Sequence, residues 1–525
     1  MVAWRSCLAL YLVTNLAYLA YGRPAEFRRP PPAGPHINLS EGDLLDANTF
    51  AAGDTTIATT YFYWYESRSG VNIRYADGRS AFRHTPTGVE DYSYLSVDWH
   101  KRQLRDMVAA GIDVVLPVYW GDPTHKAQWS FDGLKVLVQA QQEMIAAGER
   151  PPKIGMFHAC ISLSWGPDGP VDLRTELGKE WFYTTIRDFW AMVPPSLWAM
   201  VEGKPLIFLY AASFAKAHDQ TCIDHLTREF AKEFAGRVPY IVRGDGWDVE
   251  TDSRYSWGAA AFGPHILHTA AIGPGYDDSV VPGRKPIIVD REGGAFYVRG
   301  WQRLLRLPPQ HRPRIVHIET WNELHEATQI CETKEFGRLY IDLTRQYSDM
   351  YREGVRLPRG GSYARVRSVW CAPGPEKGAG LSLLPQVGDG PSKPATRGGR
   401  ACRLTTRNPY GTADYLYFDI HDSFAFWEPA QPFSIRVWYF DDSDGIMMLQ
   451  YDSSDPAGSV ADGAFKSAGE VQLEGTQTWR SHVFRLDDAR FSDRTHGGDF
   501  RIACVGAPLA VGRVSVTRGP SGPAR

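Results

Sequence analysis

The sequence predicts an α/β chain: a (β/α)8 TIM barrel followed by an all-β sandwich domain. Between about residues 55 and 355, short apolar runs alternate with amphipathic helical segments, which is typical of a parallel α/β architecture. From about residue 360, Gly/Asp turns separate short alternating runs that are typical of antiparallel strands. A length of 525 residues accommodates two domains, each with its own core.

Eight apolar runs are expected to form the strands of the barrel. Most of them are accompanied by a helical pattern, such as residues 98–111 before the second run and 224–236 before the fifth. No Gly-x-Gly-x-x-Gly turn follows a strand, so a barrel is favoured over a dinucleotide-binding sheet. The eight runs are residues 55–66, 111–122, 152–160, 204–213, 239–247, 255–263, 266–276 and 314–323.

The sequence divides into four expected regions. Residues 1–22 resemble a signal peptide, because a short apolar run after an early Arg ends in small residues. Residues 23–50 are Pro-rich and are expected to form a linker. Residues 51–357 form the catalytic barrel, and residues 358–525 form a sandwich that either resembles a carbohydrate-binding module or is structural. A secreted protein, extracellular or periplasmic, is therefore expected.

Six cysteines remain after removal of the signal peptide, an even number that is compatible with disulfides in an oxidising compartment. Cys402 and Cys504 lie in segments that could pair within the sandwich, although the sequence does not determine connectivity. Zinc is disfavoured, because none of the six has Cys-x-x-Cys spacing.

Composition narrows the class of partner. The net charge is −3 and basic residues are scattered, so a nucleic-acid partner is not expected. No stretch after the signal peptide approaches the ~18 apolar residues of a membrane span. Aromatic residues make up 13% of the chain, including 17 Trp and 25 Tyr. Such side chains can stack on sugar rings, but for most of them a large, Trp-rich core is the favoured explanation.

Polar and aromatic residues follow several of the predicted strands. In a barrel the carboxyl ends of the strands form the active-site face, so these side chains are expected to line a glycan cleft. Each has a structural alternative: His158 as a buried hydrogen-bonding residue, Asp245 as part of an Asp-Gly turn, and Tyr65 or Trp120 as core residues. The candidate substrate-binding residues are Tyr65, Trp120, His158, Asp245, Tyr276 and Asn322.

The segment ETWNELHEATQI, residues 319–330, carries Glu323 and Glu326 at the end of the last predicted strand. A metal site is disfavoured, because no second histidine follows His325 at the spacing of a His-Glu-x-x-His motif. Two acidic residues after a strand can also cap a helix. Their position among aromatic strand ends favours a catalytic acid/base pair for glycosidic cleavage instead. A structural role is expected for Glu319, and neither a metal nor a cofactor is expected.

The segment WNELHEATQI resembles the corresponding motif of glycoside hydrolase family 99, the endo-α-mannosidase and endo-α-mannanase group. The segment AIGPGYDDSVVPGR, residues 271–284, is similar to the Gly-Pro-Gly-Tyr loop of that family at the end of the preceding strand. The resemblance covers the barrel and implies retention through a 1,2-anhydro sugar. It implies that Glu323 deprotonates the 2-hydroxyl and that Glu326 is the acid, with Tyr276 and Asn322 holding the substrate.

Two positions depart from the family motif. Leu324 stands where the family has Trp, which removes an aromatic platform or wedge, and Ala327 stands where the family has Gly. The second change is expected to be harmless if the backbone does not need a positive φ there. The resulting prediction is a secreted glycoside hydrolase that cleaves a polysaccharide or glycan. The alternative is a catalytically silent glycan-binding protein.

Overall fold

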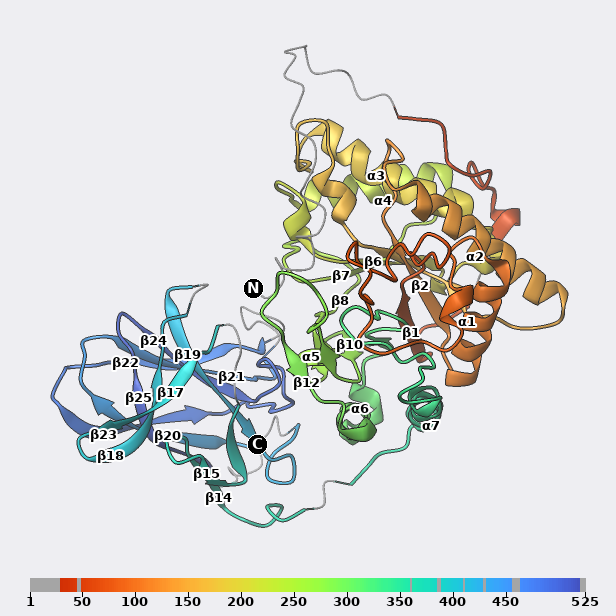
Figure 1. Cartoon of the computed structure of the whole chain (residues 1–525). Coiled ribbons are helices and arrows are strands. Elements are labelled where there is room, and N and C mark those ends of the chain that lie inside the picture. Colours follow the sequence, from red (N-terminus) through yellow and green to blue (C-terminus); the bar gives the residue numbers. More distant parts are fainter. Residues whose placement is uncertain are drawn as a thin grey trace.

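The computed structural model describes residues 29–44, 49–358, 361–384, 389–408, 411–427, 431–455 and 463–519. The predicted signal peptide lies outside these residues. Figure 1 shows two bodies: an α/β domain, coloured from red to green along the sequence, and a C-terminal β-domain, coloured from teal to blue. Within the described part of the chain, no helix is both long and apolar enough to cross a membrane.

The α/β domain is built on a curled sheet of parallel strands that fits a TIM-like fold. The spatial order is β8-β7-β6-β4-β2-β1-β13-β10, and each neighbouring pair is parallel. The outer strands β8 and β10 approach through a hydrogen bond of 2.8 Å between the hydroxyls of Ser253 and Thr269. The bounds are β1 (Thr56–Tyr61), β2 (Val114–Tyr119), β4 (Met156–His158), β6 (Lys204–Leu209), β7 (Tyr240–Arg243), β8 (Ser253–Arg254), β10 (Thr269–Ile272) and β13 (Ile315–Ile318).

Shorter strands complete this part of the chain. β3 (Lys153–Ile154) pairs with β2, while β5 (Met200–Val201) and β9 (His265–Ile266) add antiparallel partners to β6 and β10. β11 (Tyr276–Asp277) and β12 (Ile288–Val289) form a separate antiparallel pair after β10. Strands β1, β2 and β13 are buried along their whole length, as expected for a parallel sheet covered by helices.

Helices cover the outside of the sheet (Figure 1). Their starts follow ordinary capping chemistry, because Ser96, Thr175 and Asp219 each accept a hydrogen bond from a backbone N–H of the first turn. The first helix ends at Gly111, whose φ of 76° suits a residue without a side chain. The bounds are α1 (Val97–Ala110), α2 (Gln128–Ala146), α3 (Glu176–Met192), α4 (Gln220–Glu233), α5 (Ala259–Phe262), α6 (Ala295–Arg306) and α7 (Leu339–Arg352).

The sixth predicted strand, residues 255–263, is wrong in its placement. The strand is β8, which ends at Arg254, and residues 259–262 of the predicted run form the short helix α5. Gly258 and Gly263 flank this helix with φ values of 106° and 86°. A short apolar run has no periodicity that separates a strand from a helical turn, so glycine geometry and tertiary hydrogen bonds decided the outcome.

The described part of the expected linker lies against the α/β domain. Arg29 forms an ion pair with Glu180 of α3 at 2.7 Å, and the His36 N–H donates to the Ala191 carbonyl at 2.9 Å. A 3-10 turn, η2 (Glu41–Leu44), buries Leu44. These contacts fasten the segment along α3 and α4.

The C-terminal β-domain contains two antiparallel sheets around one hydrophobic core. One sheet is built on β14, β15, β17, β18, β20, β23 and β25, the other on β16, β19, β21, β22 and β24. Buried side chains of both sheets, such as Val437 and Ile502, belong to the same core. The bounds are β14 (Ser368–Ala372), β15 (Lys377–Ala379), β16 (Leu381–Leu384), β17 (Ser392–Arg397), β18 (Arg400–Thr405), β19 (Ala413–Ile420), β20 (Phe433–Asp441), β21 (Ile446–Tyr451), β22 (Lys466–Gln472), β23 (Thr478–Leu486), β24 (Phe500–Val505) and β25 (Ala510–Arg518).

The expectation of disulfides is not supported. The six cysteines from Cys160 to Cys504 are buried free thiols. Cys402 packs in a small cluster with Phe440, whereas Cys504 belongs to the main core of the β-domain. The even number reflects six buried side chains that behave as small apolar residues.

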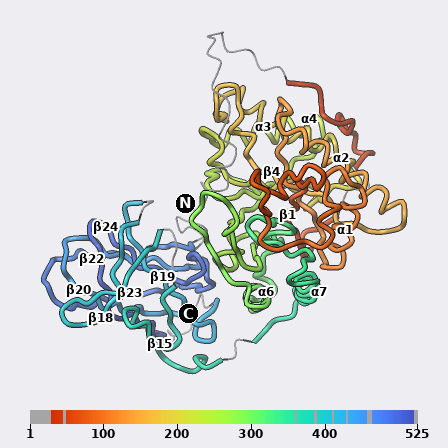
Figure 2. The backbone as a smooth tube through the Cα atoms, viewed as in Figure 1, coloured from red at the N-terminus to blue at the C-terminus, as the bar shows by residue number. Residues whose placement is uncertain are grey.

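The two domains meet at α6 (Figures 1 and 2). Arg303 Nε lies 3.0 Å from Asp493 Oδ2, and Arg306 forms an ion pair with Asp422. His311, just after α6, lies beside Trp427, with ring centroids 5.5 Å apart. α6 therefore carries both a face that packs in the α/β domain and a basic face that contacts the β-domain.

Trp301→Ala tests the packing face of α6. Trp301 is fully buried, so its removal should destabilise the α/β domain by about 3–5 kcal/mol through lost burial and a cavity. Urea unfolding followed by fluorescence measures the loss. Arg299→Ala on the same helix is the control: Arg299 is half exposed and should change stability by less than about 1 kcal/mol. Equal effects of the two substitutions would contradict the packing described.

Candidate functional site

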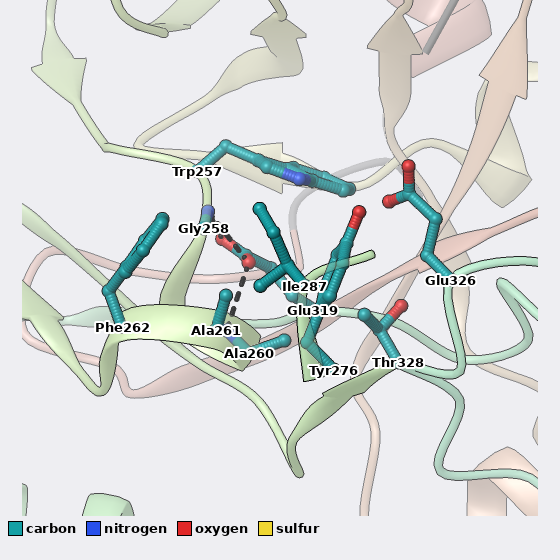
Figure 3. A pocket seen from close by; sticks show the side chains of 10 residues that line it. All are labelled: Trp257, Gly258, Ala260, Ala261, Phe262, Tyr276, Ile287, Glu319, Glu326 and Thr328. Atoms are coloured by element: carbon teal, nitrogen blue, oxygen red, sulfur yellow. Dashed lines mark hydrogen bonds between the residues drawn. The ribbon is translucent and has the colours of Figure 1, made fainter. Parts of the chain in front are cut away.

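A pocket lies at the carboxyl ends of β8, β10 and β13, the face that a TIM-like fold uses for binding. Its space is about 420 Å³, including the open mouth. Figure 3 shows Trp257 across one side, Tyr276 in the middle, and the carboxyl groups of Glu319 and Glu326 on either side of Tyr276. The lining residues are Trp257, Gly258, Ala260, Ala261, Phe262, Tyr276, Ile287, Glu319, Glu326 and Thr328.

Glu326 lines this pocket and is held by an arginine. Arg284 Nη1 donates to Glu326 Oε1 at 2.8 Å and lies 3.2 Å from Asp278 Oδ2. The same nitrogen lies 3.4 Å from the Tyr276 hydroxyl. All three charged side chains are at most 10% exposed, so the ion pairs are only weakly screened by solvent. Arg284 thus fixes the orientation of the Glu326 carboxylate toward the pocket.

Glu323 lies one turn before Glu326 and is more deeply buried, with 4% of its surface exposed. It is not among the residues that line the pocket. Its Oε1 accepts a hydrogen bond from the His325 N–H at 2.9 Å. Burial, and after it the negative charge of Glu326, raises the pKa of Glu323 to about 8. The two carboxyls therefore behave as a pair that retains one proton at neutral pH.

Glu319 is a third carboxyl in the pocket. It is 1% exposed, and burial raises its pKa to about 8. The N–H groups of Gly258 and Ala260 donate to its Oε2 at 2.9 and 3.4 Å, as the dashed lines in Figure 3 show. Glu319 thereby anchors the turn that begins α5 and carries Trp257. The structural role expected for Glu319 fits these bonds, and its position in the pocket is new.

The two sequence motifs lie side by side. The Asp277 N–H donates to the Glu326 carbonyl at 2.9 Å, which joins β11 to the segment after β13. Arg291 donates from Nη2 to the carbonyls of Ala327 and Gln329, both at 2.8 Å. These bonds hold the loop after β10 against the segment that carries the carboxylate pair. Tyr276 is brought to the pocket in this way.

Asn322 needs a correction as a predicted substrate contact. Its side chain is fully buried. Its Oδ1 accepts from the Phe62 N–H at 2.7 Å, and its Nδ2 donates to the Phe62 carbonyl at 2.8 Å. The amide therefore joins the ends of β1 and β13, and its polar atoms face the backbone instead of a ligand.

Tyr65 and His158 are also buried completely, which corrects their expected place at the glycan surface. The Tyr65 hydroxyl donates to the Asn322 carbonyl at 2.8 Å. His158 Nδ1 accepts from the Cys160 N–H at 2.8 Å, and burial lowers the pKa of His158 to about 4. Tyr65 is therefore a core residue and His158 a buried hydrogen-bonding residue, which are the structural alternatives predicted for them from the sequence.

Trp120 and Asp245 lie nearer the surface but outside the pocket lining. Trp120 is half-buried and packs edge-on against Trp64, with ring centroids 5.5 Å apart. Asp245 is exposed and accepts a hydrogen bond from Ser256 at 2.7 Å. A stacking role for Trp120 and a hydroxyl contact for Asp245 stay predictions.

The two departures from the family motif have different structural consequences. Leu324 is fully buried, so this position packs in the core and does not present a platform to the pocket. Ala327 adopts a φ of 51°, in the left-handed region. The condition under which Ala was expected to be harmless is not met, because a side chain at positive φ costs about 1–2 kcal/mol relative to Gly.

Sequence reasoning missed Trp257 and Arg284 as parts of the site. Trp257 lies within the run that was predicted as a strand, so its place at a strand end was hidden. Arg284 closes the GPGYDDSVVPGR segment, and its proximity to Glu326 depends on tertiary folding. The sequence did offer one signal for Arg284: it is a basic residue at the end of one motif, and the other motif carries two predicted catalytic carboxylates that could pair with it.

Comparisons with known proteins agree with the resemblance drawn from the motifs. The human and mouse glycoprotein endo-alpha-1,2-mannosidase-like proteins are each 33% identical to this chain over 96 residues. The matched stretch is 18% of this chain and 20% of the length of each of these relatives. The chain is thus similar to endo-α-mannosidase-like proteins over part of its length.

A family-99 endo-alpha-mannosidase from Bacteroides thetaiotaomicron is similar in structure at 17% identity, with a TM-score of 0.40. That alignment covers 58% of this chain and 98% of the bacterial chain. Residues 79–358 match a family that is described as a domain of unknown function, DUF5010. Because this match spans more than half of the chain, the protein belongs to the DUF5010 family.

Proposed function

We propose that this protein is a secreted retaining glycoside hydrolase that cleaves a polysaccharide or glycan in the pocket at the carboxyl ends of β8, β10 and β13. The observation that carries the proposal is Glu326 at the pocket wall, oriented by Arg284, with the proton-retaining Glu323 three residues before it. The endo-α-mannosidase-like relatives support the substrate class.

The proposed chemistry needs a base and an acid from one pair. Glu323 takes the proton of the sugar 2-hydroxyl, whose oxygen then attacks the anomeric carbon. Glu326 protonates the leaving oxygen as the glycosidic bond breaks, which leaves a 1,2-anhydro sugar. Water then opens this ring and gives its proton to Glu326, while Glu323 returns its proton to the 2-oxygen. Two inversions at the anomeric carbon amount to retention.

The electrostatics of the pair support acid/base work. A pair that shares one proton holds a donor and an acceptor at once, and substrate contacts decide which oxygen carries the proton. In this scheme Arg284 stabilises the ionised carboxylate of Glu326 between turnovers. The reaction starts after glycan binding has moved the proton from Glu323 to Glu326, which leaves Glu323 ionised and able to take the proton of the 2-hydroxyl.

The second candidate is a glycan-binding protein without turnover. It is favoured by the deep burial of Glu323, whose carboxyl is not part of the pocket lining. In both candidates the aromatic rings of Trp257 and Tyr276 offer faces for a sugar ring. We further propose that the C-terminal β-domain is a β-sandwich that serves either to bind glycan or to support the α/β domain.

Glu326→Gln and Glu323→Gln should each lower kcat/KM on a cleaved polysaccharide by about 10²–10⁴-fold, because each removes one partner of the acid/base pair. Release of reducing ends measures the rate. Glu353→Gln at the exposed end of α7 is the matched control and should leave the rate unchanged. Glycan binding without product from the unmodified protein, on every polysaccharide tried, would support the binding protein instead.

The pH profile tests the shared proton. Because the pKa of Glu323 is raised above its ordinary 4.5, the pair keeps its last proton through neutral pH and loses it above about 8. Activity should therefore persist at pH 7 and fall as pH rises through about 8. A profile of kcat/KM against pH measures this. A fall centred near pH 5 would contradict the proposed state of the pair.

Glu319 is expected to act by positioning Trp257, not by chemistry. Glu319→Ala removes both acceptor oxygens of the turn, so KM should rise about tenfold or more with a smaller change in kcat. Glu319→Gln keeps one oxygen that can accept from the turn, so its effect should be smaller. Steady-state kinetics separate KM from kcat. A loss of kcat in both variants as large as that of Glu326→Gln would assign Glu319 to the reaction itself.

A further inference from the structure

Three aspartates meet on the β-domain at the surface that contacts α6. Asp419 lies in β19, while Asp493 and Asp499 lie in the segment that precedes β24. Each offers a carboxylate oxygen, and these oxygens all lie within 4.8 Å of one another. We propose a calcium-binding site at the junction of the two domains, with these three aspartates as ligands. The proposal rests on this geometry and on the buried carboxylate of Asp493, which lacks hydrogen-bond donors.

Asp493 is the observation that separates this cluster from an ordinary acidic patch. Its side chain is 1% exposed, and neither of its carboxylate oxygens receives a hydrogen bond that would satisfy it. Oδ2 has an ion-pair contact with Arg303 at 3.0 Å, and Oδ1 is left without a donor. A buried carboxylate oxygen without a donor is costly, so it points to a cation that the protein is built to accept.

A neighbouring aspartate shows how this domain satisfies a buried carboxylate when no further ligand is needed. Asp452 is fully buried and accepts from the Ser492 N–H at 2.7 Å, from the Ser492 hydroxyl at 2.9 Å and from Arg494 Nε at 2.8 Å. Asp493 lies between these two donor residues in the sequence, yet its own carboxylate oxygens have no comparable set of hydrogen-bond donors. The contrast lies within one segment of chain.

The charges around the site do not balance. Asp419, Asp493 and Asp499 contribute three negative charges, and Arg303 contributes one positive charge. Arg306 is paired with Asp422, and Arg494 is paired with Asp452. Among these described groups, an excess of two negative charges is left at a buried position. One divalent cation neutralises it without moving Arg303.

The ligand chemistry favours calcium. Carboxylate oxygens are hard ligands, and Ca²⁺ accepts them in flexible, irregular arrangements completed by carbonyls and water. Mg²⁺ demands a near-octahedral arrangement at shorter distances, which three aspartates on separate segments do not readily provide. The alternative to a cation is protonation, and burial does raise the pKa of Asp493 and of Asp499.

The position of the site gives the cation a structural role. The ligands belong to the β-domain, and Arg303 belongs to α6 of the α/β domain. α6 follows the loop that carries Tyr276 and Arg284, and Gly497 of the β-domain packs against Phe262 of the pocket. Calcium at Asp493 would therefore order the surface on which the α/β domain rests. This inference does not depend on the proposed hydrolase activity.

Calcium titration of the full chain tests the site. The purified protein is stripped with EDTA, exchanged into buffer at pH 7.5, and titrated with CaCl2 or MgCl2 by calorimetry. One calcium site per chain is expected. Saturating CaCl2 should raise the midpoint of thermal unfolding by about 5 °C, because a ligand that binds only the folded state stabilises it. MgCl2 should produce a smaller shift.

Asp493→Asn is the decisive variant, because the amide keeps the shape and removes one buried charge. It should bind calcium at least tenfold more weakly and lose the thermal shift, while its midpoint in EDTA is not lower than that of the unmodified protein. Asp419→Asn replaces it if Asp493→Asn does not fold. Glu470→Gln, on the exposed side of β22, is the control and should keep the full response.

Three results would overturn the proposal. The first is no calcium heat and no thermal shift in the unmodified protein, which would mean that protons alone neutralise the cluster. The second is an equal calcium response in Asp493→Asn. The third is an equal response to MgCl2, which would exclude a site selective for calcium. Each is independent of polysaccharide cleavage.

Discussion

The burial of three carboxyl groups just after one parallel strand, β13, is the constraint on which the candidate site depends. Glu319, Glu323 and Glu326 lie within one turn-rich segment after β13, and each is at most 8% exposed. Such groups persist only if neighbours satisfy them or if they hold a proton. Glu319 accepts hydrogen bonds from backbone N–H groups, Glu326 forms an ion pair with Arg284, and Glu323 retains a proton because its pKa is raised.

The same constraint links the site to the rest of the fold. The N–H groups that satisfy Glu319 belong to the start of α5, which follows β8, and the arginine that satisfies Glu326 belongs to the loop after β10. The curled sheet brings these three strand ends together. Buried and half-buried carboxylates also gather where the two domains meet, at Asp419, Asp493 and Asp499, and Arg303 forms an ion pair with one of them, Asp493.

Several particulars of the site could be predicted from sequence and several could not. The two motifs predicted that Tyr276 and Glu326 would share one site, because each directly follows a strand of a parallel sheet. Asn322, Tyr65 and His158 follow strands in the same way, yet they are buried and bonded to backbone. Position after a strand does not determine whether a side chain faces the opening or the layer beneath it.

By itself, the sequence determined that the chain is an α/β domain followed by β-structure, and that a Glu-x-x-Glu pair ends the last parallel strand. Alternating apolar runs and local spacing carry that information, since both depend on short-range periodicity. Only the tertiary structure decided that residues 259–262 form a helix, that Ala327 adopts a positive φ, and that Arg284 meets Glu326. These outcomes depend on which buried polar groups find partners across the fold, a physical demand that no local pattern records.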